Sequence, residues 1–200
     1  MAYTDNGKLR VVYGDYVLGV HGKGFDYTFS YAQGGLESIV KNGYEWLYRC
    51  PKPTFWRALT DNDRGSKFHI KSGSWMAADT FIDCQNVEVI MDGEMQKQYA
   101  PDNNIYEGDV SADEIIVKFT YKTISNPSAT VLVGYTVTRN GKIRVDVEYH
   151  GVKGLPELPV FGMRFIMPTL ADSYMYEGLS GETYPDRKAG AVKGVYQVND

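Results

Sequence analysis

Apolar residues alternate with charged or small residues over two adjacent stretches of this chain, 131–137 and 143–149. In the second stretch, an apolar side chain occupies every odd position. A period of two is typical of a strand that buries one face, because successive side chains point to opposite sides. Between the stretches lies Asn140-Gly141, a pair that tight hairpin turns favour. The pattern predicts an antiparallel hairpin whose apolar face must be covered by other strands.

Short runs of the same kind recur along most of the chain. Asn42-Gly43 separates two of them and indicates another hairpin with a type I′ turn. Residues 160–167 are almost continuously apolar, so both faces of that strand are expected to be covered. Pro51 and Pro53 are expected to end regular pairing, because proline lacks an N–H group. The other predicted strands lie at 9–13, 16–20, 25–31, 36–40, 45–49, 87–91, 114–124 and 195–198.

Helix-forming sequence is scarce. Residues 67–81 contain the one plausible short helix, and Gly73 weakens it. The 16 Tyr, 8 Phe and 21 Gly among 200 residues favour strands and turns. Residues 92–109 are polar and predict a surface connection, and no repeat or linker divides the chain. The sequence therefore predicts a single all-β domain over residues 1–200.

The composition argues against several classes of protein. The net charge is −4 and no run of Lys and Arg occurs, which disfavours a nucleic-acid-binding surface. No stretch approaches the roughly 20 apolar residues that span a bilayer, and residues 1–10 do not resemble a secretory signal. Cys50 and Cys84 are too few for a disulfide framework and are expected to be free thiols. These features predict a cytoplasmic protein without a membrane or nucleic-acid partner.

The strand pattern stops at residues 53–65, where aromatic and charged side chains crowd into one irregular segment. Sugars are bound by aromatic faces, carboxylates and guanidinium groups. The segment supplies these groups within a few residues, so it is a candidate binding site. Its candidate residues are Trp56, Arg57, Asp61, Asn62, Asp63 and Arg64.

A purely structural role for the same segment stays open. Phe55 and Trp56 would then fill the core, and Arg57 would pair with a carboxylate. The acidic residues at 61–63 would cap their own turn through side-chain bonds to the backbone. On chemistry alone this role is favoured over sugar binding.

A metal site is not expected on this chain. Asp61, Asp63 and Gly65 resemble the start of a calcium loop, but the glycine comes one position early. Ser72 stands where the closing glutamate of such a loop would be. The three histidines are scattered rather than clustered.

A second irregular segment is expected at residues 178–187. Its candidate residues are Glu182, Tyr184, Asp186 and Arg187. Asp186 and Arg187 could form a local ion pair, or could bond across the fold to Arg57 or Asp61. In the second case the two segments would make one rigid wall.

Glycosidase chemistry needs two carboxylates about 5 to 9 Å apart. Candidates by residue type are Asp61, Asp63, Glu177, Glu182 and Asp186. Sequence spacing does not fix the distances among them, so it identifies no catalytic pair.

Several motifs of the chain resemble the C-terminal domain of glycoside hydrolase family 2 β-galactosidases, and in particular the separately encoded small subunit of two-chain bacterial enzymes. The resemblance covers essentially all 200 residues. It is carried by Phe55-Trp56-Arg57-Ala58, Thr60-Asp61-Asn62-Asp63-Arg64-Gly65 and Gly181-Glu182-Thr183-Tyr184-Pro185-Asp186-Arg187, and by similar residues at 1–4, 34–38 and 45–49.

This resemblance implies a two-sheet β-supersandwich related to the galactose mutarotase fold. Family small subunits run on well past residue 200, so the sandwich is expected to be incomplete at its C-terminal end. An incomplete sandwich exposes an open sheet edge, through which copies of the chain could associate.

The resemblance also implies an activity, the retaining hydrolysis of terminal β-D-galactose in lactose-like β-galactosides. The catalytic glutamates of the family lie in a separate TIM barrel, so this chain is expected to carry no catalytic residue and no cofactor. Mg²⁺ is implied for the catalytic partner. The isolated chain is therefore expected to be inactive, with its two irregular segments facing a large catalytic subunit.

Two other functions stay open on the sequence. A stand-alone carbohydrate-binding sandwich would bind galactosides through Trp56 and its polar neighbours. An enzyme similar to aldose 1-epimerases would need a general acid and base, commonly a histidine with a carboxylate. None of the three histidines lies in either irregular segment, so the epimerase is the least favoured.

Overall fold

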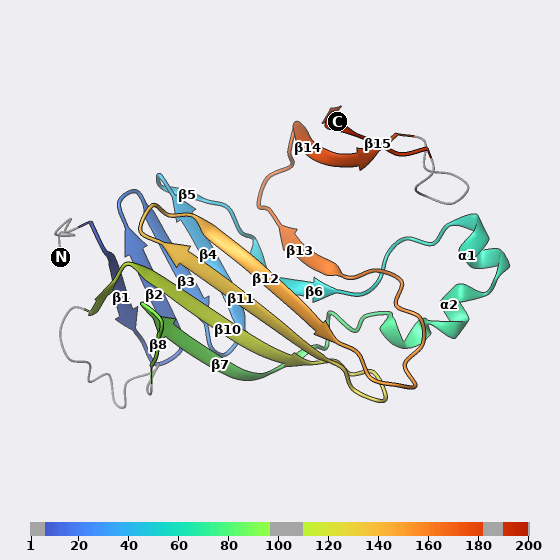
Figure 1. The fold of residues 1–200 in the computed structure, drawn as a ribbon, viewed down its shortest axis with the longest axis horizontal. Helices are drawn as coiled ribbons and strands as arrows, with labels where there is room; N and C mark the ends of the chain where they lie inside the picture. Colours follow the sequence, from blue (N-terminus) through green and yellow to red (C-terminus); the bar gives the residue numbers. More distant parts are fainter. Residues whose placement is uncertain (1–6, 97–109, 182–189, 200) are drawn as a thin grey trace. The chain divides into compact units, whose positions relative to one another are not determined.

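The computed structural model describes residues 7–96, 110–181 and 190–199, and most of these residues lie in antiparallel strands (Figure 1). The chain divides into two compact units, Met1–Met167 and Pro168–Asp200. The prediction of one domain over residues 1–200 stays a prediction.

The first unit contains two main sheets. One sheet has the strand order β5-β4-β3-β2-β1-β9, and the other has the order β12-β11-β10-β7-β8. The first consists of β1 (Leu9–Tyr13), β2 (Val17–Gly22), β3 (Phe25–Ser30), β4 (Gly35–Lys41), β5 (Tyr44–Glu45) and β9 (Val110–Ala112). The second consists of β7 (Asp83–Met91), β8 (Glu94–Met95), β10 (Glu114–Lys122), β11 (Thr130–Thr138) and β12 (Ile143–His150).

The two sheets share one hydrophobic core. The ring of Phe29 on β3 lies 6.5 Å from Phe119 on β10 and 5.7 Å from Tyr135 on β11, centroid to centroid. The hydroxyl of Tyr27 donates a hydrogen bond of 2.7 Å to the carbonyl of Gly141, which joins β3 to the β11–β12 turn. The predicted all-β sandwich is therefore confirmed.

The hairpin pattern of the sequence is also confirmed. β11 and β12 pair from Val137↔Ile143 to Val131↔Tyr149, with the odd positions of β11 fully buried. Between β4 and β5, Asn42 and Gly43 have φ angles of 52° and 78°, as a type I′ turn requires.

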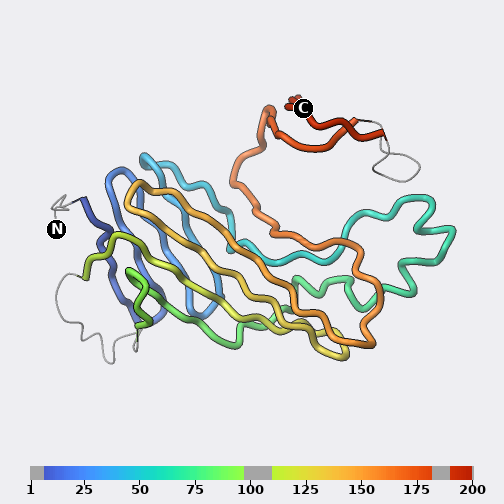
Figure 2. Tube along the Cα trace, in the orientation of Figure 1, coloured from blue at the N-terminus to red at the C-terminus, as the bar shows by residue number. Residues whose placement is uncertain are grey.

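The prolines of the segment before residue 55 do not behave as predicted. β6 (Arg49–Thr54) contains Pro51 and Pro53, yet it pairs with β13 (Gly162–Ile166) from Thr54↔Gly162 to Arg49↔Ile166 (Figure 2). The prediction that these prolines end regular pairing is wrong. A strand with one hydrogen-bonded neighbour tolerates proline, because the missing N–H can face the unpaired side.

The apolar run at 160–167 is less covered than predicted. Phe165 and Met167 are both exposed, and β13 has β6 as its one paired neighbour among the described residues. An apolar run reports which side chains can be buried, but not whether a covering layer is present.

Short helices follow β6. They are α1 (Asp61–Gly65), α2 (Phe68–Lys71) and the 3₁₀ turn η1 (Gly73–Trp75). The prediction of a short helical region near 67–81 is confirmed by α2 and η1. The helix α1 was not predicted, because residues 61–65 show the polar composition of a loop. It forms because Thr60 caps its first turn.

The second unit is a hairpin of β14 (Ser173–Ser180) and β15 (Val192–Asn199). The strand predicted at 195–198 is confirmed. β14 was not predicted, and residues 178–180 belong to it rather than to an irregular segment. The rings of Tyr176 and Tyr196 stack at 5.4 Å, directly opposite each other on the two strands.

Both cysteines carry free thiols, as predicted. Cys50 is buried and Cys84 is half-buried, and burial raises the pKa of both thiols.

Gly34 lies against Cys84, and its φ of +58° is rare for residues with a side chain. The Lys52 ammonium donates to the carbonyl of Gln33 at 2.5 Å and to that of Gly34 at 3.3 Å.

Every helix in the described part of the chain is too short or too polar to cross a membrane.

Candidate functional site

The irregular segment at 53–65 is anchored in the core at its beginning. Phe55 is fully buried, and its ring stacks on Trp75 at 5.4 Å and lies 6.1 Å from Phe161. The indole N–H of Trp75 donates to the carbonyl of Pro156 at 3.2 Å. The aromatic cluster therefore holds the start of the segment against the sandwich.

Trp56 does not present an open face to solvent. It is half-buried and packs against the hydrophobic core. Its backbone carbonyl accepts a hydrogen bond of 3.4 Å from Arg164, which also donates to Asp79 at 3.0 Å and to Thr54 at 2.8 Å. Trp56 is thus braced from β13, and its ring serves packing.

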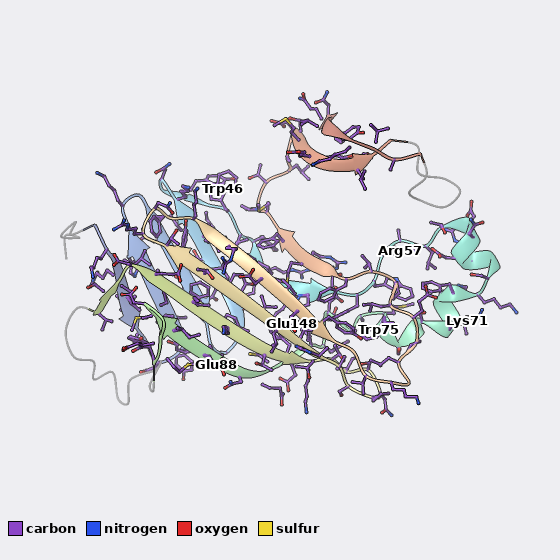
Figure 3. All side chains as sticks on the ribbon, viewed as in Figure 1. Trp46, Arg57, Lys71, Trp75, Glu88 and Glu148 are labelled. Carbon is purple, nitrogen blue, oxygen red and sulfur yellow. The ribbon has the colours of Figure 1, made fainter. Side chains whose placement is uncertain are left out.

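Arg57 and Asp63 are brought together by the fold. Nη1 of Arg57 lies 2.5 Å from Oδ2 of Asp63, and Nη2 lies 3.1 Å from Oδ1, so the pair is bidentate. Arg57, labelled in Figure 3, lies on the segment that leads to α1. Its guanidinium group also donates to the carbonyls of Ala58 at 3.0 Å and Pro159 at 3.2 Å. One guanidinium group therefore ties three parts of the chain together.

Asp63 completes a reciprocal cap at the start of α1. Its N–H donates to Oγ1 of Thr60 at 3.2 Å, and its carboxylate accepts from the N–H of Thr60 at 2.8 Å. The hydrogen bonds from Arg57, followed by the bond from the Thr60 backbone, hold the pKa of Asp63 well below its usual range. At neutral pH the carboxylate is therefore charged, and both of its oxygens are already hydrogen-bonded within the chain.

The other charged residues of the segment face solvent. Arg64 pairs with Asp61 and also donates to the carbonyl of Leu59 at 3.3 Å. The side chain of Asn62 is exposed, and its backbone carbonyl accepts from the N–H of Ser66 at 2.9 Å. Of the predicted residues described here, Asp61, Asn62 and Arg64 are the ones most accessible to a ligand or partner.

A small polar cleft of about 230 Å³ lies beside β6 and β13. Arg49, Lys52 and Arg164 contribute three positive charges to its lining, and Asp79 contributes one negative charge. The sequence did not indicate this cleft. Asp79 and Arg164 are 85 positions apart, so no local motif could have joined them.

The predicted residues Glu182, Tyr184, Asp186 and Arg187 lie outside the described residues. A bond from Asp186 or Arg187 to the first segment therefore stays a prediction. Among the carboxylates suggested for a glycosidase pair, Asp63 is occupied by Arg57, and Glu177 lies on β14 with Lys193 at 3.9 Å.

Two histidines lie beside carboxylates. Nδ1 of His21 is 2.6 Å from Oδ1 of Asp26 between β2 and β3, and Nε2 of His150 is 3.3 Å from Oε1 of Glu148 along β12. All four side chains reach solvent, and neither pair belongs to the segment at 53–65. In the described ranges, no group of three or more His, Cys, Asp and Glu side chains could hold a metal ion.

The role of Asp63 can be tested through the pH dependence of stability. A carboxyl whose pKa is depressed by folding stabilises the native state above its unfolded pKa of about 3.9, and this contribution is lost as pH falls. Asp63→Asn is therefore expected to lower the free energy of unfolding at pH 7 and to flatten its decline below about pH 5.

Urea unfolding followed by tryptophan fluorescence between pH 3.5 and 7 measures both effects. Asp61→Asn is the matched control, because the Asp61 side chain is 96% exposed and pairs at the surface. If both variants show the wild-type dependence on pH, the bidentate pair does not stabilise the fold.

Comparison with known proteins identifies the family. Residues 21–199 match the family described as β-galactosidase small chain. The chain is 57% identical to the β-galactosidase small subunit of Latilactobacillus sakei over 99% of its own length and 62% of that protein. It is 36% identical to a β-galactosidase of Clostridium acetobutylicum over 98% of its length, and 31% identical to one of Lactobacillus delbrueckii subsp. bulgaricus over 98%.

The chain spans only part of these relatives, 62% of the small subunit and 20% and 18% of the two longer proteins. The family match nevertheless covers the described strands from β3 to β15 and the Arg57–Asp63 segment alike. The chain therefore belongs to the β-galactosidase small chain family.

Proposed function

We propose that this chain is a non-catalytic small subunit or domain of a retaining β-galactosidase of glycoside hydrolase family 2. A separate subunit with a TIM barrel would hydrolyse terminal β-D-galactose in lactose-like β-galactosides. The observation that carries the proposal is the family match over residues 21–199. The L. sakei relative is itself a small subunit, which supports a role beside a larger partner.

The braced segment gives this role a physical basis. Phe55 and Arg57 fix the segment to the sandwich, whereas Asp61, Asn62 and Arg64 remain exposed on α1. A surface that is already ordered loses little conformational entropy when a partner docks on it. An ordered surface of this kind can position a partner's substrate although it provides no catalytic group.

No catalytic residue or cofactor is assigned to this chain. The acid/base and nucleophile glutamates would belong to the barrel of the partner, and Mg²⁺ would serve that partner. The longer relatives support this division, because the chain accounts for only 20% of the C. acetobutylicum β-galactosidase. Most of such an enzyme must lie in other domains.

The alternative of a stand-alone sugar-binding module has less support. Trp56, its proposed stacking residue, is half-buried and packs against the core. Calorimetry of the isolated chain with galactose and lactose separates the two functions. The small-subunit role predicts no saturable heat, whereas a sugar-binding module predicts it.

Charge reversal at the exposed part of α1 tests the proposed docking face. Asp61→Lys is expected to weaken association with the large catalytic subunit about fivefold, because charges at an interface rim steer and orient the partners. Hydrolysis of o-nitrophenyl galactoside at limiting chain concentration should fall in parallel. Surface plasmon resonance and the hydrolysis assay measure the two effects.

Glu94→Lys is the control, because Glu94 is also exposed but lies on β8, away from the segment. It is expected to leave both measurements unchanged. If wild-type chain fails to bind the large subunit or to increase its hydrolysis, the proposed function is wrong. If Asp61→Lys behaves as wild type, the docking face lies elsewhere.

A further inference from the structure

The polar cleft beside β6 and β13 has an excess of positive charge in its lining. Arg49, Lys52 and Arg164 are its cations, and Asp79 is its one carboxylate. Two positive charges of the lining therefore have no carboxylate within it. Because these charges belong to the lining itself, a group that fills the cleft must be anionic to balance them.

Two of the cations face each other across a strand pair. Lys52 on β6 is the direct partner of Arg164 on β13. Like charges directly opposite each other destabilise strand pairing. Asp79 compensates Arg164, because its Oδ2 accepts a hydrogen bond of 3.0 Å from Nη1 of the guanidinium group. Lys52 has no such compensation from the lining, and a further anion would stabilise this strand pair.

Neutral groups hold the Lys52 ammonium in place. It donates to the carbonyls of Gln33 and Gly34 and lies 5.3 Å from the ring centroid of Tyr121. Carbonyls and ring faces attract a cation but do not neutralise its charge. Burial lowers the pKa of Lys52, so its surroundings disfavour the charged form. An anion beside the ammonium would offset this effect.

Arg49 contributes the other uncompensated charge. It lies opposite Ile166 of β13, and its side chain is exposed at the cleft. A guanidinium group presents its N–H donors in a planar fork. This fork matches two oxygens of a phosphate or carboxylate group.

The size and charge of the cleft limit what can bind there. Pockets for drug-sized ligands measure about 300–1,000 Å³, and the volume here is about 230 Å³, which suits a smaller ligand. A single protein carboxylate would bring one negative charge for two uncompensated cations. A phosphate monoester brings about two negative charges near neutral pH.

We propose that the cleft beside β6 and β13 binds a small, doubly charged oxyanion of the phosphate or phosphate-monoester class. Arg49 binds two of its oxygens through the guanidinium fork, and Lys52 contacts it as a point charge. Arg164 stays paired with Asp79 and adds to the positive field. The proposal does not rest on the proposed function.

Calorimetric titration of the whole chain with inorganic phosphate tests this site. At about pH 8 and constant ionic strength, the wild type is expected to bind phosphate with a dissociation constant of about 1 mM or below. Sulfate has a similar shape and charge and is expected to bind comparably. Chloride carries one charge and cannot be held by two forked contacts, so it is expected to give no saturable heat.

Substitution of Arg49 is the first test of the residues. Arg49→Ala is expected to raise the dissociation constant for phosphate about tenfold, because it removes a charge-assisted bidentate contact. Arg49→Lys is expected to recover part of the affinity, since lysine keeps the charge but lacks the fork. Arg139→Ala is the matched control, because Arg139 is 68% exposed and lies outside the lining of the cleft.

Asp79→Asn tests the charge balance in the opposite direction. Asparagine keeps the shape of the side chain and an oxygen that accepts from Arg164, but it removes the one negative charge of the lining. The dissociation constant for phosphate is expected to fall about threefold. Damage to the fold would weaken binding, so tighter binding cannot arise from a misfolded variant. Circular dichroism confirms that each variant is folded.

A titration with galactose 6-phosphate distinguishes the two sources of the oxyanion. Binding about tenfold tighter than that of inorganic phosphate would identify a sugar phosphate as the ligand. Equal dissociation constants would identify the free anion.

Three results would overturn the proposal. The first is a wild-type chain that gives no saturable heat with phosphate or sulfate up to about 10 mM. The second is an Arg49→Ala variant that binds both anions as the wild type does, which would indicate an adventitious ion only. The third is an Arg49→Ala variant that weakens only the association with the large catalytic subunit, because the cleft would then meet an acidic side chain of that partner.

Discussion

Replacing Phe55 with alanine is expected to lower the free energy of unfolding by about 3–5 kcal/mol. The ring is fully buried and makes ring contacts with Trp75, Phe161 and Tyr149, so its removal opens a cavity that these large neighbours cannot close. The segment at 53–65 would also be held less firmly against the core. Chemical denaturation followed by tryptophan fluorescence measures the change.

Phe81→Ala is the control for this prediction. Phe81 is 61% exposed, so the same truncation is expected to cost less than about 1 kcal/mol. Equal costs for the two variants would show that Phe55 does not anchor the segment.

Gly34→Ala is expected to destabilise the chain by about 2–4 kcal/mol, through two effects that add. A Cβ at Gly34 would lie 2.4 Å from Cβ of Cys84 and 2.7 Å from its sulfur, which forces the backbone or β7 to move. The φ of +58° also disfavours any residue with a side chain. Thermal and urea unfolding of the variant measure the sum.

Gly93→Ala separates the two effects. Gly93 has a φ of +85°, but no atom lies within 4 Å of its added Cβ. Alanine there is expected to cost only the backbone term, about 1 kcal/mol. If Gly34→Ala costs no more than Gly93→Ala, the contact with Cys84 is easily relieved.

The sequence predicted the parts of the fold that depend on near neighbours. The hairpin of β11 and β12 joins stretches only a few residues apart, and its turn residues and alternation both lie within them. β6 and β13 pair across more than a hundred residues, and the two prolines of β6 misled the prediction. Pairing at that distance is decided by packing, which local propensity does not report.

In the segment at 53–65, too, contacts between near neighbours were predicted and contacts between distant residues were not. The pairing of Arg57 with a carboxylate and the capping of the turn were both foreseen as a structural role, because the partners lie within a few residues of each other. Arg164 and Asp79 were missed, although they brace Trp56 and Thr54. Their contact depends on the position of β13, which no local pattern specifies.

The hydrogen bond from Arg57 to the carbonyl of Pro159 joins positions that are 102 residues apart. Because Arg57 also holds Asp63, the first turn of α1 cannot open without breaking a contact to that distant part of the chain. Local opening of a short exposed helix is thereby coupled to the sandwich, and the backbone amides of α1 are expected to exchange with deuterium more slowly than those of an unanchored surface turn.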